Sequence, residues 1–328
     1  MINIAIIGAG NIGSRHLQAL AKLEFKLNIF VVDPNPISIK TSRERYNEVA
    51  TNQNIKVTYH DSIILLPSKL DLVIIATTSE YRYLVLEEIV QNFNIDYIIF
   101  EKFLFQKLSE YKTAKNLLKN NKIKAWVNCW PRITNIFQEL KESLDLNSIV
   151  SINVYGSNWG LASNSIHFID LFNYLIGGTN NQIIKVIKPT VYVKKTSEGI
   201  VKEKFFDLSG SIVGLFNRIP YSIISYNKGV VPLTVEVVSE ESVQTINLDT
   251  KTCSLSSLDN DWKSESYNIE IPHQSDQTYI HVEKILKSNE CDLCKYDLSF
   301  DLHYYFLNYL IKHFENTDLV KGNKCLIT

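Results

Sequence analysis

The chain lacks the features that mark membrane, secreted or nucleic-acid-binding proteins. No window of its sequence approaches the roughly 18 continuous apolar residues that a transmembrane helix needs. The N-terminus enters a strand-like run directly, without the charged region and cleavage site of a secretion signal. Lys and Arg number 34 against 35 Asp and Glu, so no basic excess is available for a nucleic-acid backbone. We therefore expect a cytoplasmic protein that binds neither membrane nor nucleic acid.

Cysteine is scarce as well, with five residues at Cys129, Cys253, Cys291, Cys294 and Cys325. An odd, scattered set is typical of thiols kept reduced inside a cell. Cys291 and Cys294 form a CxxC pair, but neither a second pair nor a histidine cluster completes a metal-ligand set. The sequence thus predicts ordinary thiols and no metal site.

The length and composition indicate a globular protein of two domains. Hydrophobic residues make up 45% of the chain and charged residues 21%, which excludes a disordered protein. A chain of 328 residues is longer than one hydrophobic core usually supports. We predict a first domain over residues 1–128 and a second over 129–328.

The predicted elements define an α/β protein. In the first third, strands predicted over 2–8, 30–33, 55–60, 71–77, 97–100 and 123–128 alternate with helices over 12–24, 38–50, 80–92 and 109–120. This order predicts a doubly wound parallel Rossmann sheet, whose ligands bind beyond the carboxyl ends of the strands. Beyond residue 180, strand-like runs separated by turn residues predict a C-terminal α+β domain with a large, mostly antiparallel open sheet. A helix around 302–314 follows, with an aromatic stripe that we interpret as core.

A glycine-rich turn follows the first predicted strand and opens a helix, as dinucleotide-binding sites require. The motif GxGxxG is formed by Gly8, Ala9, Gly10, Asn11, Ile12 and Gly13. Gly8 permits a tight turn, Gly10 lets a pyrophosphate approach the backbone, and Gly13 lets helix and strand pack closely. The helix start at Asn11 and Ile12 supplies unpaired N–H groups to the phosphates.

Asp33 ends the second predicted strand, twenty residues after Gly13. A carboxylate there accepts hydrogen bonds from the adenosine ribose hydroxyls and repels a 2′-phosphate. The cofactor is therefore predicted to be NAD(H) in preference to NADP(H).

Five motifs in order make the chain resemble the Gfo/Idh/MocA family of glucose-fructose oxidoreductases and inositol dehydrogenases. They are GAGNIGSRH (8–16), VVD (31–33), DLVIIATTSEYR (71–82), EKFL (101–104) and SIHFIDLFNYLIGG (165–178). The resemblance covers at least residues 1–178 and is looser beyond them.

The resemblance implies two catalytic residues, Lys102 and His167. Lys102 would hydrogen-bond the substrate oxygen and stabilise the charge that develops during hydride transfer. His167 would exchange the hydroxyl proton as general acid and base. Three positions depart from the family pattern: Arg82 stands where the family often has histidine, Phe103 replaces a proline after the lysine, and Ser163 replaces an aspartate four residues before the histidine. The change at Ser163 removes a carboxylate that would orient the imidazole.

Further positions follow from the resemblance. Thr77, Arg82 and Glu101 are predicted beside the cofactor, at or just beyond the ends of the fourth and fifth strands. The predicted substrate positions are Asn128, Arg132, Trp159, Ser163 and Asn164. For Trp159 the alternatives are stacking on a substrate ring and simple packing. Asp170 is interpreted as orienting a neighbour or capping structure.

These observations predict an NAD-dependent oxidoreductase. It would act on a secondary alcohol or ketone of a sugar or nucleotide-activated sugar, for instance in surface-polysaccharide or sialic-acid-like biosynthesis. The family resemblance also implies a homodimer or homotetramer. Because of Ser163 and Phe103, a cofactor-binding sensor or regulatory protein with weakened or lost catalysis stays open as the alternative.

Overall fold

The computed structural model describes residues 1–195 and 201–328, and these residues form two compact units. Unit 1 comprises residues 1–128 and 272–300, and unit 2 comprises residues 129–271 and 301–328. The predicted boundary at residue 128 coincides with the first division between the units. Residues 272–300, predicted within the second domain, belong to unit 1.

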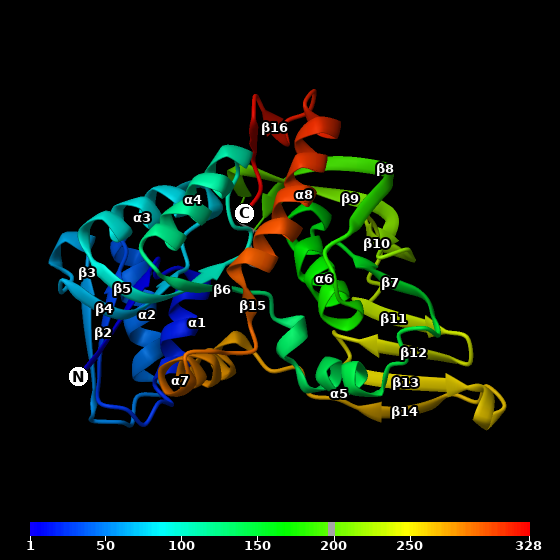
Figure 1. Ribbon diagram of the computed structural model, residues 1–328, viewed down its shortest axis with the longest axis horizontal. Coiled ribbons are helices and arrows are strands. Elements are labelled where there is room, and N and C mark those ends of the chain that lie inside the picture. Colours follow the sequence, from blue (N-terminus) through cyan, green and yellow to red (C-terminus); the bar gives the residue numbers. More distant parts are fainter. Residues whose placement is uncertain (196–200) are drawn as a thin grey trace. The chain divides into compact units, whose positions relative to one another are not determined.

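Unit 1 contains a seven-stranded sheet in the order β15-β6-β5-β4-β1-β2-β3 (Figure 1). Its strands are β1 (Ile2–Ile7), β2 (Leu27–Val32), β3 (Ile55–His60), β4 (Lys69–Ile75), β5 (Asn94–Glu101), β6 (Lys124–Asn128) and β15 (Cys294–Lys295). Strands β1 to β6 pair in parallel, which confirms the predicted Rossmann sheet. The short β15 pairs antiparallel with β6 and was not predicted.

Helices connect these strands, because parallel neighbours need crossover connections. They are α1 (Asn11–Leu20), α2 (Pro36–Asn47), α3 (Ser79–Asn92) and α4 (Leu108–Asn120), and α7 (Thr278–Ser288) lies in the returning segment. The central strands are buried over continuous apolar runs such as 4–7 and 72–75, as expected for a sheet covered on both faces.

Unit 2 contains an eight-stranded sheet in the order β14-β13-β12-β11-β7-β10-β9-β8. The strands are β7 (Ile149–Ser157), β8 (Asn181–Lys195), β9 (Val201–Phe216), β10 (Ile219–Tyr226), β11 (Thr234–Ser239), β12 (Ser242–Asn247), β13 (Thr252–Ser257) and β14 (Glu265–Asn268). All neighbours are antiparallel except β7 and β10, so the prediction of a mostly antiparallel sheet is confirmed. Strands β7 and β13 were not predicted.

Helix α6 (Leu161–Ile176) packs against β9 and β10 of this sheet. Phe172 lies 5.3 Å from Tyr221 and 6.2 Å from Phe216 between ring centroids. The apolar side chains of the helix are fully buried at Ile166, Ile169, Leu171, Phe172 and Leu175. Gly177 ends the helix with a positive φ of 82°. Unit 2 also contains α5 (Asn135–Ser143) and the small β16 (Val320–Lys321) and β17 (Lys324–Cys325) pair. Helix α8 (Tyr296–Phe314) spans the division between the units.

Candidate active site

The glycine turn has the geometry that its three glycines were predicted to serve. Gly8 has a φ of 98°, and a Cβ there would lie 2.8 Å from the backbone of Ala76. A Cβ on Gly13 would lie 1.7 Å from the carbonyl oxygen of Gly8, so no side chain fits between helix and turn. A Cβ on Gly10 would meet nothing within 4 Å. The backbone at Gly10 therefore faces open space, as a site for close approach of a diphosphate requires.

The start of α1 offers donors to an anion. Its N-cap is Gly10, and no side chain caps the helix. Asn11 is exposed, and Ile12 is an exposed apolar residue with 45% of its surface accessible. Unpaired N–H groups and the positive end of the helix dipole favour a negatively charged ligand there.

Asp33 ties the end of β2 to the glycine turn. One carboxylate oxygen accepts a hydrogen bond from the Ala9 amide at 2.7 Å, and the other accepts one from the Asn35 amide at 2.8 Å. The carboxylate is half-buried, and each oxygen has lone pairs left for further donors. Its position at the carboxyl end of β2, beside the turn, fits ribose recognition.

Thr77 lies at the carboxyl side of β4, next to the turn. Its buried Oγ1 has no hydrogen-bond partner among the described residues. An orphaned hydroxyl beside an open glycine backbone fits a bound dinucleotide, which could satisfy it. The residues of the turn therefore fit the NAD group that the motif implies.

Glu101 is held in a closed ring of side chains within unit 1. The Nε2 atom of His16 lies 3.0 Å from the Glu101 carboxylate, and the Nδ1 atom lies 2.8 Å from the Thr278 hydroxyl. The Asn128 amide donates to Glu101 at 2.6 Å and to Gln274 at 2.7 Å. Gln274 donates to Thr278 at 2.8 Å, which completes the ring.

This ring stabilises a buried negative charge. Burial alone would raise the pKa of Glu101, but hydrogen bonds from His16 and Asn128 and the charge of Arg82 outweigh it, so the pKa lies below its ordinary value. A carboxylate only accepts, so the His16 Nε2 carries a proton and donates it to Glu101. Glu101 is thus held rigidly where β5 ends, and this fixes the backbone from which half-buried Lys102 projects.

Arg82 supports the same segment from α3. Its guanidinium donates to the carbonyls of Phe103, Leu104 and Thr77. Only 2% of its surface is accessible, and burial lowers its pKa to about 10. The structure therefore places Arg82 beneath the Lys102 loop as a buried support. Phe103 is fully buried, and the peptide bond between Lys102 and Phe103 is cis.

In unit 2, His167 lies on α6 with 8% of its surface accessible. Its ring contacts Trp130 edge to face, with centroids 6.2 Å apart. One turn along the helix, the carboxylate of Asp170 pairs with the guanidinium of Arg132 at 2.8 Å. Asn173 accepts from the same guanidinium at 3.1 Å. Arg132 thus joins the 3-10 turn Pro131–Ile133 to α6.

Ser163, at the position of the missing family aspartate, contacts a carboxylate that comes from another strand. Asp207 of β9 accepts hydrogen bonds from the Ser163 hydroxyl and from the backbone amides of Ala162 and Ser163, at 2.7 and 3.2 Å. Lys194 of β8 donates to the Ser163 hydroxyl at 3.0 Å. Asp207 is buried and caps the first turn of α6 in place of a local N-cap side chain. The negative charge lost at Ser163 is thus present in this turn as Asp207.

Trp159 and Asn164, just before and within the first turn of α6, both make contacts inside unit 2. The Trp159 indole donates to the carbonyl of Ile224 at 2.8 Å, and its ring packs edge to face on Phe168 at 5.4 Å. The Asn164 amide donates to the carbonyl of Trp159. Of the two alternatives for Trp159, these contacts favour packing.

Sequence reasoning missed His16, Gln274, Thr278, Asp207 and Arg45. His16 closes the GAGNIGSRH motif, but helix periodicity gave it no special place. Arg45 of α2 donates to the Ser14 hydroxyl at 2.7 Å and to the Asn11 carbonyl at 3.3 Å, which adds a positive charge beside the glycine turn. Gln274, Thr278 and Asp207 carry no local signal, because their partners are distant in sequence.

Two further observations concern the whole described chain. None of the helices in residues 1–195 and 201–328 has the length and apolar character needed to cross a bilayer. In the same residues, no group of three or more His, Cys, Asp or Glu side chains could hold a metal ion.

Comparison with known proteins now identifies the class. Residues 2–129 match the Gfo/Idh/MocA family model, described as an oxidoreductase family with an NAD-binding Rossmann fold. The family prediction is confirmed for these residues: the Rossmann unit of the chain is that of the Gfo/Idh/MocA family of NAD(P)-binding oxidoreductases. No curated protein sequence matches the chain closely enough to count as a relative.

Solved structures share the fold over nearly the whole chain. UDP-N-acetylglucosamine 3-dehydrogenase GnnA from Acidithiobacillus ferrooxidans is 13% identical with a TM-score of 0.65, covering 94% of this chain and 96% of its own. An oxidoreductase from Agrobacterium radiobacter in complex with NAD+, L-tartaric acid and magnesium is 14% identical with a TM-score of 0.69, covering 94% of each chain. A super-repressor mutant of Gal80p from Saccharomyces cerevisiae is 12% identical with a TM-score of 0.71, covering 96% of each chain. These likenesses concern the fold.

Proposed function

We propose that the protein transfers hydride between NAD(H) and a secondary alcohol or ketone of a sugar or nucleotide-activated sugar. The observation that carries the proposal is the glycine turn, open at Gly10 and closed at Gly13, with the Asp33 carboxylate hydrogen-bonded to its backbone. NAD, when bound, supplies the nicotinamide that accepts or donates the hydride. The substrate class is supported by the GnnA structure, whose own substrate is a nucleotide sugar.

The cofactor-binding residues are proposed to be those of the turn together with Asp33 and Thr77. The amides at the start of α1 would hold the diphosphate, with Arg45 adding positive charge close by. Asp33 would accept from the ribose hydroxyls and oppose a 2′-phosphate, which makes NAD(H) the preferred cofactor. Glu101 acts on the site indirectly, as a positioning residue beneath Lys102.

Lys102 and His167 are proposed as the catalytic residues. The Lys102 ammonium would donate a hydrogen bond to the reacting oxygen and stabilise negative charge on it. The His167 imidazole would remove or return the hydroxyl proton. Asn128 donates a hydrogen bond to Gln274, and Arg132 forms an ion pair with Asp170. We propose that Asn128 and Arg132 shape the substrate site through these contacts.

A panel of nucleotide sugars and polyols, followed by NADH absorbance in both directions, tests the proposal. We expect turnover with at least one of them. Lys102→Met and His167→Asn should each lower kcat by at least about a hundredfold, in the range of lost electrostatic and acid–base assistance, while NADH affinity stays within twofold. Asp33→Ser should shift the preference toward NADPH. Tighter binding of NADPH than of NADH by the unmodified protein would contradict the role of Asp33.

The second candidate is an NAD(H)-binding regulatory protein. Ser163 and Phe103 depart from the family pattern, and the Gal80p structure, a repressor by its description, has the same fold. A regulatory protein would bind NADH with the same dependence on Gly10 and Asp33 but would turn over no member of the panel. Substrate-free NADH titration thus tests both candidates, and turnover separates them.

We also propose a homo-oligomer formed through the sheet face of unit 2 opposite α6. Tyr155 of β7 and Ile224 of β10 are register neighbours on this face and are half-exposed. Asn153 links Ser222 and Glu236 across three strands of the same face, with hydrogen bonds of 2.7 and 3.1 Å. Light scattering should give a dimer or tetramer, and Ile224→Lys should reduce it to monomers.

A further inference from the structure

A cavity of about 490 Å³ lies at the β6 edge of the unit 1 sheet. Its walls come from α4, β6, β15 and the start of α8. It opens beside Lys124, where β6 begins, whereas Asn128 at the other end of β6 is level with Glu101. The cavity therefore lies at the amino ends of the parallel strands, away from the glycine turn at their carboxyl ends.

The rim of this cavity carries an excess of positive charge. Four lysines and two carboxylates line it, namely Lys115, Lys119, Lys124, Lys295, Glu290 and Asp297. Asp297 pairs with Lys115 at 3.1 Å, and Glu290 pairs with Lys295 at 3.1 Å and more loosely with Lys124 at 3.8 Å. Lys119 forms no ion pair with the described residues. Two positive charges are left over for a ligand.

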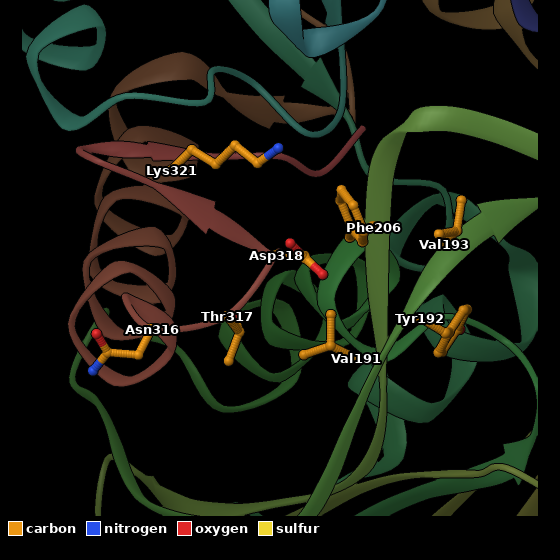
Figure 2. Close-up of a pocket in the computed structure, with 8 residues that line it drawn as sticks. All are labelled: Val191, Tyr192, Val193, Phe206, Asn316, Thr317, Asp318 and Lys321. Carbon is orange, nitrogen blue, oxygen red and sulfur yellow. The ribbon is translucent and has the colours of Figure 1, made fainter.

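A second cavity shows the contrast. It has about 530 Å³ in unit 2, and among the described residues that line it, Asp318 and Lys321 are the charged ones, one of each sign (Figure 2). It therefore has no excess charge with which to select an ion.

Two aromatic residues with unpaired polar atoms line the floor of the lysine-lined cavity. Trp126 and Tyr296 are 2% and 5% exposed, and neither the indole Nε1 nor the phenol oxygen has a hydrogen-bond partner among the described residues. Unpaired buried donors are costly, so such groups in a native protein point to a missing partner. Burial also raises the pKa of Tyr296, which keeps its hydroxyl protonated as a donor at neutral pH.

We propose that this cavity binds a small organic anion with an aromatic or apolar body and a phosphate group. The body packs on the rings of Trp126 and Tyr296, and the phosphate lies among the rim lysines. This site is separate from the proposed cofactor site, and the inference does not depend on the proposed catalytic activity.

Isothermal titration with phenyl phosphate tests the proposal, with inorganic phosphate and benzyl alcohol as partial ligands. The unmodified protein should bind phenyl phosphate more tightly than either partial ligand. Lys119→Glu reverses a rim charge and should weaken binding by at least about tenfold, the loss expected for a hydrogen bond to a charged group. The matched control is Lys56→Glu, an exposed lysine on β3 at the opposite edge of the same sheet, which should bind as the unmodified protein does.

Tyr296→Phe gives an independent measurement, because it removes only an unpaired hydroxyl. The Tm without ligand should stay the same or rise, while phenyl phosphate binds severalfold more weakly. Binding that is equal in the unmodified protein, Lys119→Glu and Tyr296→Phe would overturn the assignment. Absence of binding to the unmodified protein, or equal affinity for benzyl alcohol, would overturn it too. No cofactor is present in this titration, so its failure is distinguishable from failure of the proposed oxidoreductase activity.

Discussion

Replacement of Asp207 tests whether a distant carboxylate supports the histidine helix. In Asp207→Ala, the amides of Ala162 and Ser163 and the Ser163 hydroxyl all lose their acceptor in a buried setting. Asp207→Asn keeps the shape and one carbonyl oxygen but loses the negative charge at the helix start. The two variants therefore separate the loss of the two backbone-amide hydrogen bonds from the loss of the charge.

The expected magnitudes follow from these contacts. Loss of a helix cap costs about 0.5–2 kcal/mol, and each buried donor left unpaired costs about 1–3 kcal/mol. Partial rearrangement limits the sum, so Asp207→Ala should lower the free energy of unfolding by about 3–5 kcal/mol. Asp207→Asn should cost about 1–2 kcal/mol, because the charge and the acceptor of the Ser163 hydroxyl are lost while the remaining oxygen still accepts from the two amides.

Urea unfolding followed by circular dichroism gives these free energies, and hydrogen exchange of the α6 amides locates the effect. The matched control is Asp249→Asn, an exposed carboxylate that accepts one backbone amide, from Leu233 at 2.8 Å. It should change stability by less than about 0.5 kcal/mol. If Asp207→Ala is as mild as this control, or leaves α6 amide protection unchanged, the capping argument is refuted.

Three further predictions concern unit 1. Gly13→Ala should destabilise the fold by about 1–3 kcal/mol, because its Cβ would overlap the Gly8 carbonyl. Gly10→Ala should leave the free energy of unfolding in urea unchanged but weaken NADH binding. Equal losses of stability in the two variants would contradict this difference. Burial lowers the pKa of His281 to about 4 from an ordinary 6.5, so folding stability is complete above pH 6.5 and falls as the pH drops toward 4, by up to about 3 kcal/mol. The urea midpoint of His281→Leu should not fall in this pH range. If the midpoints of His281→Leu and the unmodified protein fall in parallel with pH, His281 is not the group responsible. Arg82→Met should cost about 3–5 kcal/mol by leaving three buried carbonyls without their donor, and an unchanged Tm would show that this support is dispensable.

Much of the Rossmann half was predictable because its signals are local. Apolar periodicity distinguishes strands from helices within a few residues, and all six parallel strands lie where the pattern placed them. The roles of Gly8, Gly10 and Gly13 follow from their spacing around one turn, and Asp33 follows from the length of one βαβ unit. Strand β7 was not predicted because it precedes the β-rich region beyond residue 180, and its pairing in the middle of that sheet depends on the tertiary structure.

The sequence by itself determined the fold class, the glycine turn and the positions of Lys102 and His167, since each rests on a short motif or on helix and strand periodicity. Only the tertiary structure decided which side chains support those positions. His16 meets Thr278 across 262 residues, and Ser163 meets Asp207 across 44. No local pattern encodes such pairs, because a hydrogen bond between distant residues depends on the path of the whole chain. For the same reason, the carboxylate that appeared to be lost at Ser163 is found on a neighbouring strand.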